Sequence, residues 1–214
     1  MTIKFRFHPE KAVEAAAILL KLHGKPMKYI GLLKMLYIAD RLALKTMDQP
    51  ITGDRYVSMD YGPVLRGVYD LIKGQPVDSA LPLWSKYISP RDSNYVDLLQ
   101  YPGNEELCEE EEMILKQVYE TFGHLNPFLV EELCEEEEMI LKQVYETFGH
   151  LDPFLVAEWT HDLPEWKDPH GSAIPILVED VLRSMGKTEE EIEDISQEAQ
   201  REAYLDGALP KILG

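Results

Sequence analysis

The side chains best suited to chemistry include five histidines that are scattered without a metal-binding spacing. They are His23, His124, His150, His161 and His170. No two histidines stand four residues apart and the chain has no Cys-x-x-Cys pair, so the spacings typical of zinc sites are missing. We therefore expect no metal site and no cofactor. Only His161-Asp162 has mixed chemistry nearby, in Trp159 and Trp166, and a hydrolase that uses His161 is one alternative.

Runs of carboxylates are the next candidates for chemistry. Four consecutive Glu residues occur at 109–112 and again at 135–138. Paired carboxylates can act as general acid and base. At the start of a helix, however, they complement the helix dipole, and we expect these to be solvated. The chain also lacks GxGxxG, GxxxxGK[ST] and GxSxG motifs, so no nucleotide cradle or serine nucleophile is predicted. We expect a protein that is not an enzyme.

The elements that would position such residues include a tandem repeat. Residues 105–130 and 131–156 are identical except for Asn126 against Asp152. Each copy predicts one helix with an acidic first turn and a Gly stop, followed by a second start at Asn-Pro or Asp-Pro. We predict one continuous helix over about 127–148, so that the 26-residue duplication adds a helix–turn unit. A natural duplication and an engineered one, used as a scaffold, are both open.

Charge is distributed unevenly along the 214 residues, which sum to −18. Residues 1–104 carry a net charge of +4, residues 105–156 carry −13, and residues 157–214 carry −9. An acidic surface repels nucleic acid and attracts basic partners, so no nucleic-acid partner is expected and a basic protein partner would fit. Solubility alone is the alternative explanation of any single Glu run.

Cellular location is predicted from what the sequence lacks. No apolar run approaches the roughly 18 residues of a membrane span, and no signal region is apparent at the start. The two cysteines, Cys108 and Cys134, occupy the same position in the two repeat copies and indicate no disulfide framework. We expect a cytoplasmic protein with no membrane partner.

Helix signals dominate the rest of the chain, and we predict a mainly α (α+β) fold. Helices are expected at about 8–24, 28–45, 63–73 and 174–184, with an acidic C-terminal helix at about 188–206. Residues 55–59 and 95–99 alternate in polarity and are expected to pair as a two-stranded ribbon on the helices. Residues 76–92 contain three prolines and are expected to form a loop.

Asp40 lies near the edge of the apolar stripe of the helix at 28–45, where an unpaired carboxylate would be costly. We expect it to pair with Arg66 or with a backbone amide, and a role in partner recognition is the alternative. Tyr56, Tyr61 and Tyr69 suit a core as well as an interface, since each has an apolar ring and a polar tip.

The stretch 34–73 resembles the Panacea domain, the SocA-like antitoxin family, through YIAD, PITGDRYV and YGPV at their spacings. The helix at 8–22 and the segment YETFGHLDPFLVAEWTHDLPEW are similar to further parts of the family, although a residue separates Pro164 from Trp166. The resemblance implies a single domain over 1–214, with the duplication inside it. No catalytic residue is carried over from the family.

The resemblance also implies the function. We expect an antitoxin that neutralises a cognate toxin by direct binding. The alternative from a different class is an adaptor that delivers the toxin to a Clp-type protease. Candidate partner-binding residues come from the matching motifs and their surroundings: Asp40, Gly53, Asp54, Tyr56, Tyr61, Gly62, Pro63, Arg66 and Tyr69.

Overall fold

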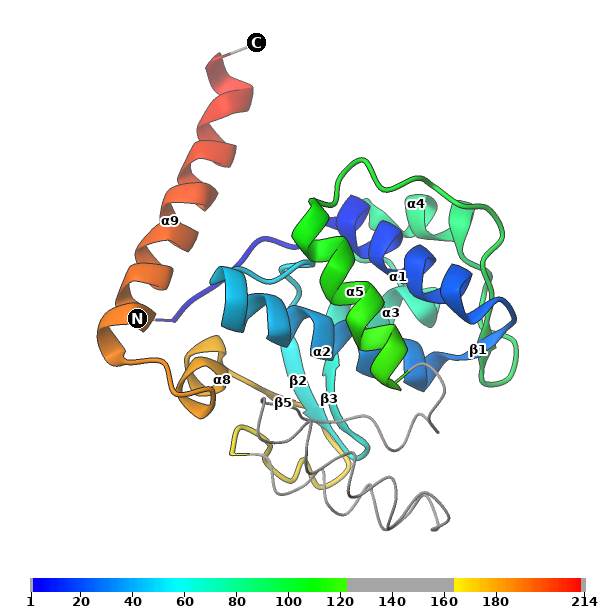
Figure 1. The fold of residues 1–214 in the computed structure, drawn as a ribbon, viewed down its shortest axis with the longest axis horizontal. Helices are drawn as coiled ribbons and strands as arrows, with labels where there is room; N and C mark the ends of the chain where they lie inside the picture. The colour runs from blue at the N-terminus through cyan, green and yellow to red at the C-terminus, as the bar shows by residue number, and fades with distance from the viewer. Residues whose placement is uncertain (1, 123–163, 213–214) are drawn as a thin grey trace.

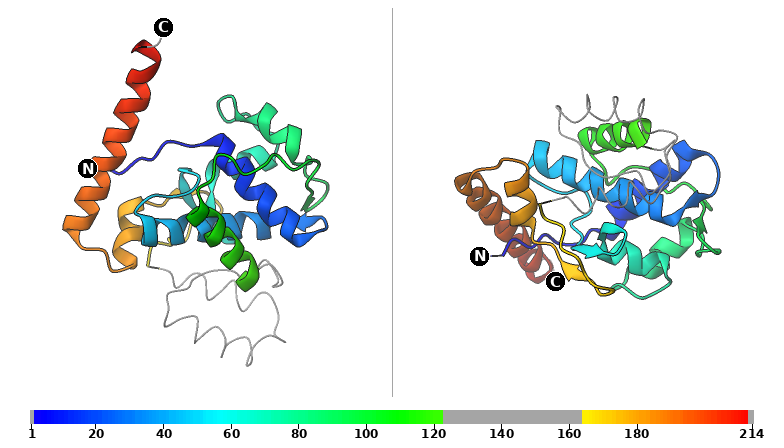
Figure 2. Two further views of the ribbon diagram at one scale, coloured as in Figure 1. Left: turned by 45° about the horizontal axis from the view of Figure 1, so that its top comes forward. Right: turned by 90° about the horizontal axis from the view of Figure 1, so that it is seen from below.

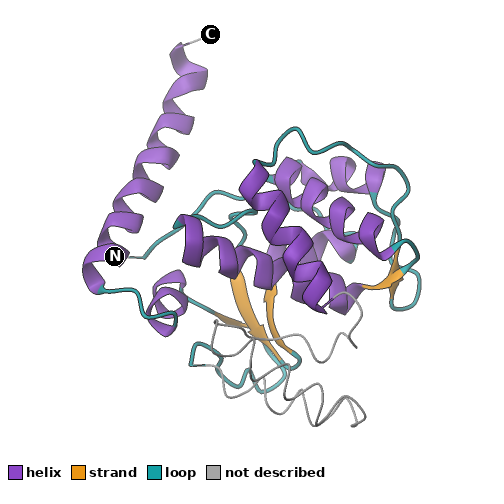
Figure 3. Cartoon of the chain, viewed as in Figure 1, coloured by secondary structure: helices purple, strands orange, loops and turns teal. Residues whose placement is uncertain are grey.

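The structure, a computed structural model, describes residues 2–122 and 164–212 of the chain (Figure 1). As expected, it is mainly α with small antiparallel sheets (Figure 3). The helices are α1 Pro9–His23, α2 Tyr29–Met47, α3 Arg66–Ile72, α4 Ala80–Tyr87, α5 Glu109–Phe122, α8 Val178–Ser184 and α9 Glu189–Ile212. The strands are β1 Met27–Lys28, β2 Tyr56–Met59, β3 Gly62–Leu65, β4 Tyr95–Val96 and β5 Ile174–Pro175.

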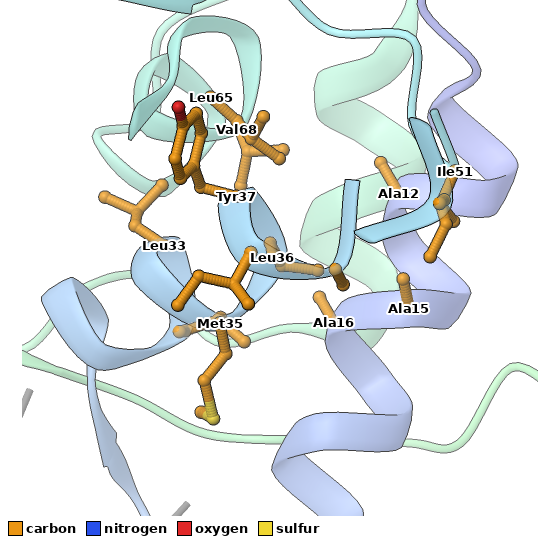
Figure 4. Packing of buried hydrophobic residues seen from close by; sticks show 14 of the residues in the cluster. Ala12, Ala15, Ala16, Leu33, Met35, Leu36, Tyr37, Ile51, Leu65 and Val68 are labelled. Atoms are coloured by element: carbon orange, nitrogen blue, oxygen red, sulfur yellow. The ribbon is translucent and has the colours of Figure 1, made fainter. Parts of the chain in front are cut away.

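The core forms where α1, α2 and α5 meet. Pro9 starts α1 in the first turn, where its missing N–H has no intrahelical acceptor, and Gly24 ends the helix in the left-handed conformation. Small side chains of α1, among them Ala12, Ala15 and Ala16, let its backbone approach α2 and the larger Leu36 closely (Figure 4). All four of these side chains are buried, and each core leucine contributes about 1.5–3 kcal/mol.

The strands form two small sheets, and the expected ribbon of 55–59 with 95–99 is wrong. β2 is the central strand of the order β3-β2-β5, and β4 instead pairs with β1, with Lys28 opposite Tyr95. The segments 55–59 and 95–99 both alternate in polarity, but this alternation alone does not determine which strands pair. Helices pack against both sheets, which two-residue strands need for stability.

The helix expected at 63–73 begins only at Arg66, because Gly62–Leu65 forms strand β3. Val57 pairs with Val64 and Ser58 with Pro63 in an antiparallel hairpin. Pro63 is tolerated because β3 is an edge strand, so its missing N–H costs no ladder hydrogen bond to a further strand.

The loop expected at 76–92 is also wrong, because it contains helix α4. Pro82 lies in the first turn of α4, where a residue without an N–H is tolerated. Trp84 anchors the helix, since its side chain is buried in the core.

The C-terminal region differs in part from the expected helix at 174–184. Residues Ile174–Pro175 pair with β2 as β5, and α8 starts at Val178. α9 runs six residues beyond the expected end at 206 and begins with a capping box, in which Thr188 Oγ1 accepts from the Glu191 N–H and the Glu191 carboxylate accepts from the Thr188 N–H. α9 projects from the body of the molecule (Figures 1 and 2).

The helix of the first repeat copy is confirmed as α5, with four Glu residues in its first turn. One of these, Glu111, is not solvated as expected: it is buried and forms an ion pair of 2.6 Å with Lys11 of α1. The second copy, the continuous helix expected over about 127–148 and His161 lie outside the described residues. Within those residues, no helix is both long and apolar enough to cross a membrane.

Candidate partner-binding site

Asp54 holds the start of α3 from a loop twelve residues upstream. One carboxylate oxygen, Oδ1, accepts from the backbone N–H of Gly67 at 2.9 Å and of Arg55 at 2.7 Å, and Oδ2 accepts from Val68 at 2.9 Å. The N–H groups of Gly67 and Val68 have no acceptor within their own helix, so Asp54 replaces a local N-cap. Burial raises the pKa of Asp54, although these hydrogen bonds oppose that shift.

Two glycines permit this close approach. A Cβ on Gly67 would lie 2.9 Å from Asp54 Oδ1, and Gly53, at φ +65°, faces the backbone carbonyl of Arg6. The positive φ suits glycine because it lacks a Cβ. The Pro-Ile-Thr-Gly-Asp loop thus joins α3 to the N-terminal segment. Its aspartate caps α3, and its glycine allows close contact with the N-terminal segment.

Asp40 is fully buried on α2 and pairs with a backbone amide, one of the two partners expected. Its Oδ1 accepts from the Thr52 N–H at 2.9 Å and its Oδ2 from the Thr52 hydroxyl at 2.6 Å. The Tyr56 hydroxyl makes a longer bond of 3.5 Å. Pairing with Arg66 is wrong, because Arg66 lies on the outer side of α3 and forms an ion pair with Asp70 at 2.9 Å.

Burial dominates the titration of this network. It raises the pKa of Asp40 to about 7, because the hydrogen bonds from Thr52 offset the loss of water only in part. It also raises the pKa of Tyr56 well above its usual value, with the negative charge of Asp40 adding to the effect. The Tyr37 ring meets that of Tyr56 edge to face, with centroids 5.4 Å apart.

Asp40→Asn is expected to change how stability depends on pH. Unfolded Asp40 titrates near 3.8 and folded Asp40 near 7, so between these values the folded state holds the extra proton. The contribution of Asp40 to the free energy of unfolding therefore falls as the pH rises through this window. Between pH 5 and pH 8 the wild type should lose about 2–3 kcal/mol relative to Asp40→Asn, measured by urea denaturation.

The exposed Asp78 offers a matched control, since Asp78→Asn makes the same chemical change at the surface. Its stability curve should run parallel to that of the wild type. A parallel curve for Asp40→Asn as well would show that Asp40 does not hold the proton.

Sequence reasoning missed a second buried polar cluster, on the next face of α2. Glu165 is buried, and its Oε1 accepts from Arg41 Nε at 3.2 Å and from the Tyr37 hydroxyl at 3.4 Å. Arg41 also donates to Ser184 Oγ of α8 at 3.1 Å, and buried Lys34 donates to the Pro63 carbonyl of β3 at 3.2 Å. The spacing of Lys34, Tyr37 and Arg41 places them on one helix face, which was the available signal.

The segment after residue 163 covers the β2–β3 hairpin. Trp166 Nε1 donates to the Met59 carbonyl at 3.3 Å, and the Gly171 N–H donates to Asp60 Oδ1 at 3.1 Å. The Ile176 N–H donates to the Tyr56 carbonyl at 3.0 Å. These bonds connect the hairpin to residues more than 100 positions away in the sequence.

The nine candidate residues divide into an inner group and an outer group. Asp40, Gly53, Asp54, Tyr56, Gly62 and Pro63 are buried. Tyr61 at the hairpin turn is 58% exposed, and Arg66 and Tyr69 are half-buried on α3. Arg66 and Lys73 both face the Tyr69 ring, at 5.9 and 4.2 Å from its centroid. Tyr61 and Arg66 lie at opposite ends of β3, and Tyr69 follows on α3.

Residues 32–135 match the family described as antitoxin SocA-like, Panacea domain. This segment is similar to the SocA-like Panacea domain. The match confirms the resemblance, contains all nine candidate residues, and supports a general antitoxin role with a protein partner. It leaves out α1 and the segment after 135, whose sequences also resemble parts of the family. Comparisons with curated proteins and with solved structures found no match.

Among residues 2–122 and 164–212, no group of three or more His, Cys, Asp or Glu side chains could hold a metal ion. His170, one of the five histidines considered, is exposed and lies 3.4 Å from Asp168.

Proposed function

We propose that this protein is an antitoxin that neutralises a cognate toxin by direct binding through the outer edge formed by the β2–β3 turn and α3. The family match over residues 32–135 is the observation that carries the proposal. The site supports it, because Asp40 and Asp54 fix the hairpin and α3 from inside while Tyr61 and Tyr69 reach the surface.

Tyrosine suits this role because it adds a large contact area with few rotatable bonds. Arginine suits it because its guanidinium offers several directed hydrogen-bond donors. Tyr61 is exposed at the turn, and Asp60 and Met59 beside it are held by the segment 166–171. A turn fixed in this way loses little conformational entropy on binding. The proposal places the complex in the cytosol and expects no catalytic step.

Tyr61→Ala and Tyr69→Ala are each expected to weaken toxin binding about tenfold or more, since aromatic anchors dominate interface energetics. The assay co-expresses the chain with the product of the adjacent gene, scores growth rescue, and measures affinity on the purified complex. Tyr95→Ala is the matched control, because Tyr95 is also an exposed tyrosine and lies on the other sheet.

Rescue with an undiminished toxin level and a stable complex is the expected result. Rescue in which the toxin disappears, and reappears in a strain lacking the Clp-type protease, would favour the adaptor mechanism instead. If Tyr95→Ala weakens binding while Tyr61→Ala and Tyr69→Ala do not, the docking surface lies elsewhere.

A further inference from the structure

The end of the molecule at the β1–β4 sheet gathers positive charge in a strongly acidic chain. Segments 21–28 and 86–101 together hold five Lys and Arg residues against two Asp residues. We call this surface the basic end, and its cations are Lys21, Lys25, Lys28, Lys86 and Arg91. β1–β4 pairing joins the two segments, and the Tyr29 N–H donates to the Asn94 carbonyl at 2.9 Å.

The sheet turns its polar face outward at the basic end. Met27 and Val96 pair across the two strands and are buried. Because side chains alternate along a strand, their neighbours Lys28 and Tyr95 share the opposite face, where Tyr95 is 44% exposed. The half-buried Lys28 and the exposed ring of Tyr95 thus lie side by side on this face.

Three of the five cations of the basic end contact aromatic rings. Lys21 lies 3.9 Å from the centroid of Tyr101, Lys86 lies 4.6 Å from that of Tyr87, and Arg91 lies 5.0 Å from that of Tyr29. None of the five cations forms an ion pair with any residue in the described ranges. The two acids of these segments are engaged locally: Asp97 accepts from the Leu98 N–H, and Asp92 from the Ser93 hydroxyl.

α9 has the complementary charge. It carries eight Asp and Glu residues against one Arg and one Lys. Ile192, Ile195 and Ala199 are buried on its inner face. Helical spacing places Glu190, Glu193 and Asp194 on the opposite face, where all three are exposed and none has a cation partner among the described residues.

Tyr204, at 75% exposure, continues this outer face of α9. α9 and the basic end lie at opposite ends of the molecule in two views (Figures 1 and 2). The helix has 24 residues, or about 36 Å, and projects away from the body. The two surfaces therefore cannot meet within one chain.

We propose that the basic end of one copy binds the outer face of α9 of a second copy. Carboxylates of α9 would meet Lys25, Lys28 and Arg91, and Tyr204 would offer its ring to a cation in the way that Tyr29 already does. If both contacts form reciprocally, the assembly closes as a two-fold dimer. This inference stands apart from toxin binding, which was assigned to the β2–β3 turn and α3.

Salt should affect this contact in a distinctive way. Each chain carries −18, so two chains repel at long range when the Debye length is about 30 Å, at about 0.01 M salt. At about 0.1 M that repulsion is largely screened, while charge pairs at contact distance survive. At about 1 M the contact pairs weaken too. Association should therefore be strongest at intermediate salt.

Sedimentation velocity of the full chain tests the proposal, with the charges reversed on one surface at a time. Lys28→Glu with Arg91→Glu, and separately Glu190→Lys with Asp194→Lys, should each weaken self-association at least tenfold. Mixing the two double variants should restore it, because each then offers the charge that the other lacks. Lys45→Glu with Lys73→Glu makes an equal charge change elsewhere and should leave the dimer intact.

Restoration in the mixture also shows that both variants are folded. A wild-type chain that stays monomeric at about 0.1 M salt and about 100 µM protein would overturn the proposal. An oligomer that neither reversal weakens would overturn it as well. So would a monomer whose basic end binds a single-stranded oligonucleotide, since the occupant would then be nucleic acid.

Discussion

Gly53→Ala is expected to lower the free energy of unfolding by about 3–5 kcal/mol, although it adds a single methyl group. The added Cβ would lie 1.9 Å from the Arg6 carbonyl oxygen and 2.8 Å from its carbon. These are backbone atoms, and the N-terminal segment is held in place by the bond of 2.9 Å from the His8 N–H to the Thr52 carbonyl. Relief of the clash therefore requires the loop and the N-terminal segment to separate.

Gly24→Ala separates steric clash from backbone strain. Gly24 has nearly the same φ, +69° against +65°, but a Cβ there would meet nothing within 4 Å. In Gly24→Ala the free energy of unfolding should fall only by the cost of placing alanine in the left-handed conformation, about 1–2 kcal/mol. Urea denaturation of both variants gives the comparison. Equal losses would mean that the Arg6 carbonyl does not constrain the loop.

Local signals were sufficient for elements whose ends are set by local chemistry. Pro9 and Gly24 predict both ends of α1, and Thr188 followed by Glu191 predicts the start of α9. Each of these signals depends on atoms within four residues of one another. The minor sheets were different, because β2 pairs with β5 across 116 positions and β4 pairs with β1 across 67. Nothing local in a strand of two residues indicates such a partner.

Gly62-Pro63 shows how a local signal can favour the wrong element. Proline near the start of a predicted helix is common, which favoured a helix from 63. Pairing with β2 extends the chain through Leu65 instead, and an edge strand tolerates proline as readily as a first helical turn does. The local preference was compatible with both elements, and the tertiary contact selected one.

The sequence predicts that a buried polar residue needs a hydrogen-bond or ion-pair partner, but it does not predict which residue that partner is. A carboxylate at Asp40 requires a partner, yet sequence could not choose between Arg66 and a backbone amide. The chosen partner, Thr52, lies in the loop that returns over α2. Glu165 pairs with Arg41 across 124 positions, a distance at which one sequence contains no pairing signal.

Asp54→Ala is expected to destabilise the fold by about 3–5 kcal/mol, because it removes the acceptor of three backbone N–H groups. Two of these belong to Gly67 and Val68 at the start of α3, where the replaced cap alone is worth about 1–2 kcal/mol. Relief of the buried charge offsets part of the loss, since burial raises the pKa of Asp54. Urea denaturation gives the total.

Asp54→Asn tests which part of this role depends on both oxygens. Asparagine keeps one acceptor but turns an amide NH₂ toward a backbone N–H, so its loss should fall between zero and that of Asp54→Ala. Hydrogen exchange should be faster at the amides of Gly67 and Val68 in both variants, and little changed in α1. If α3 stays protected in Asp54→Ala, the helix does not depend on this cap. If it opens, Tyr69 loses its fixed position while Tyr61 keeps its own, so the two parts of the proposed docking surface can be tested separately in one molecule.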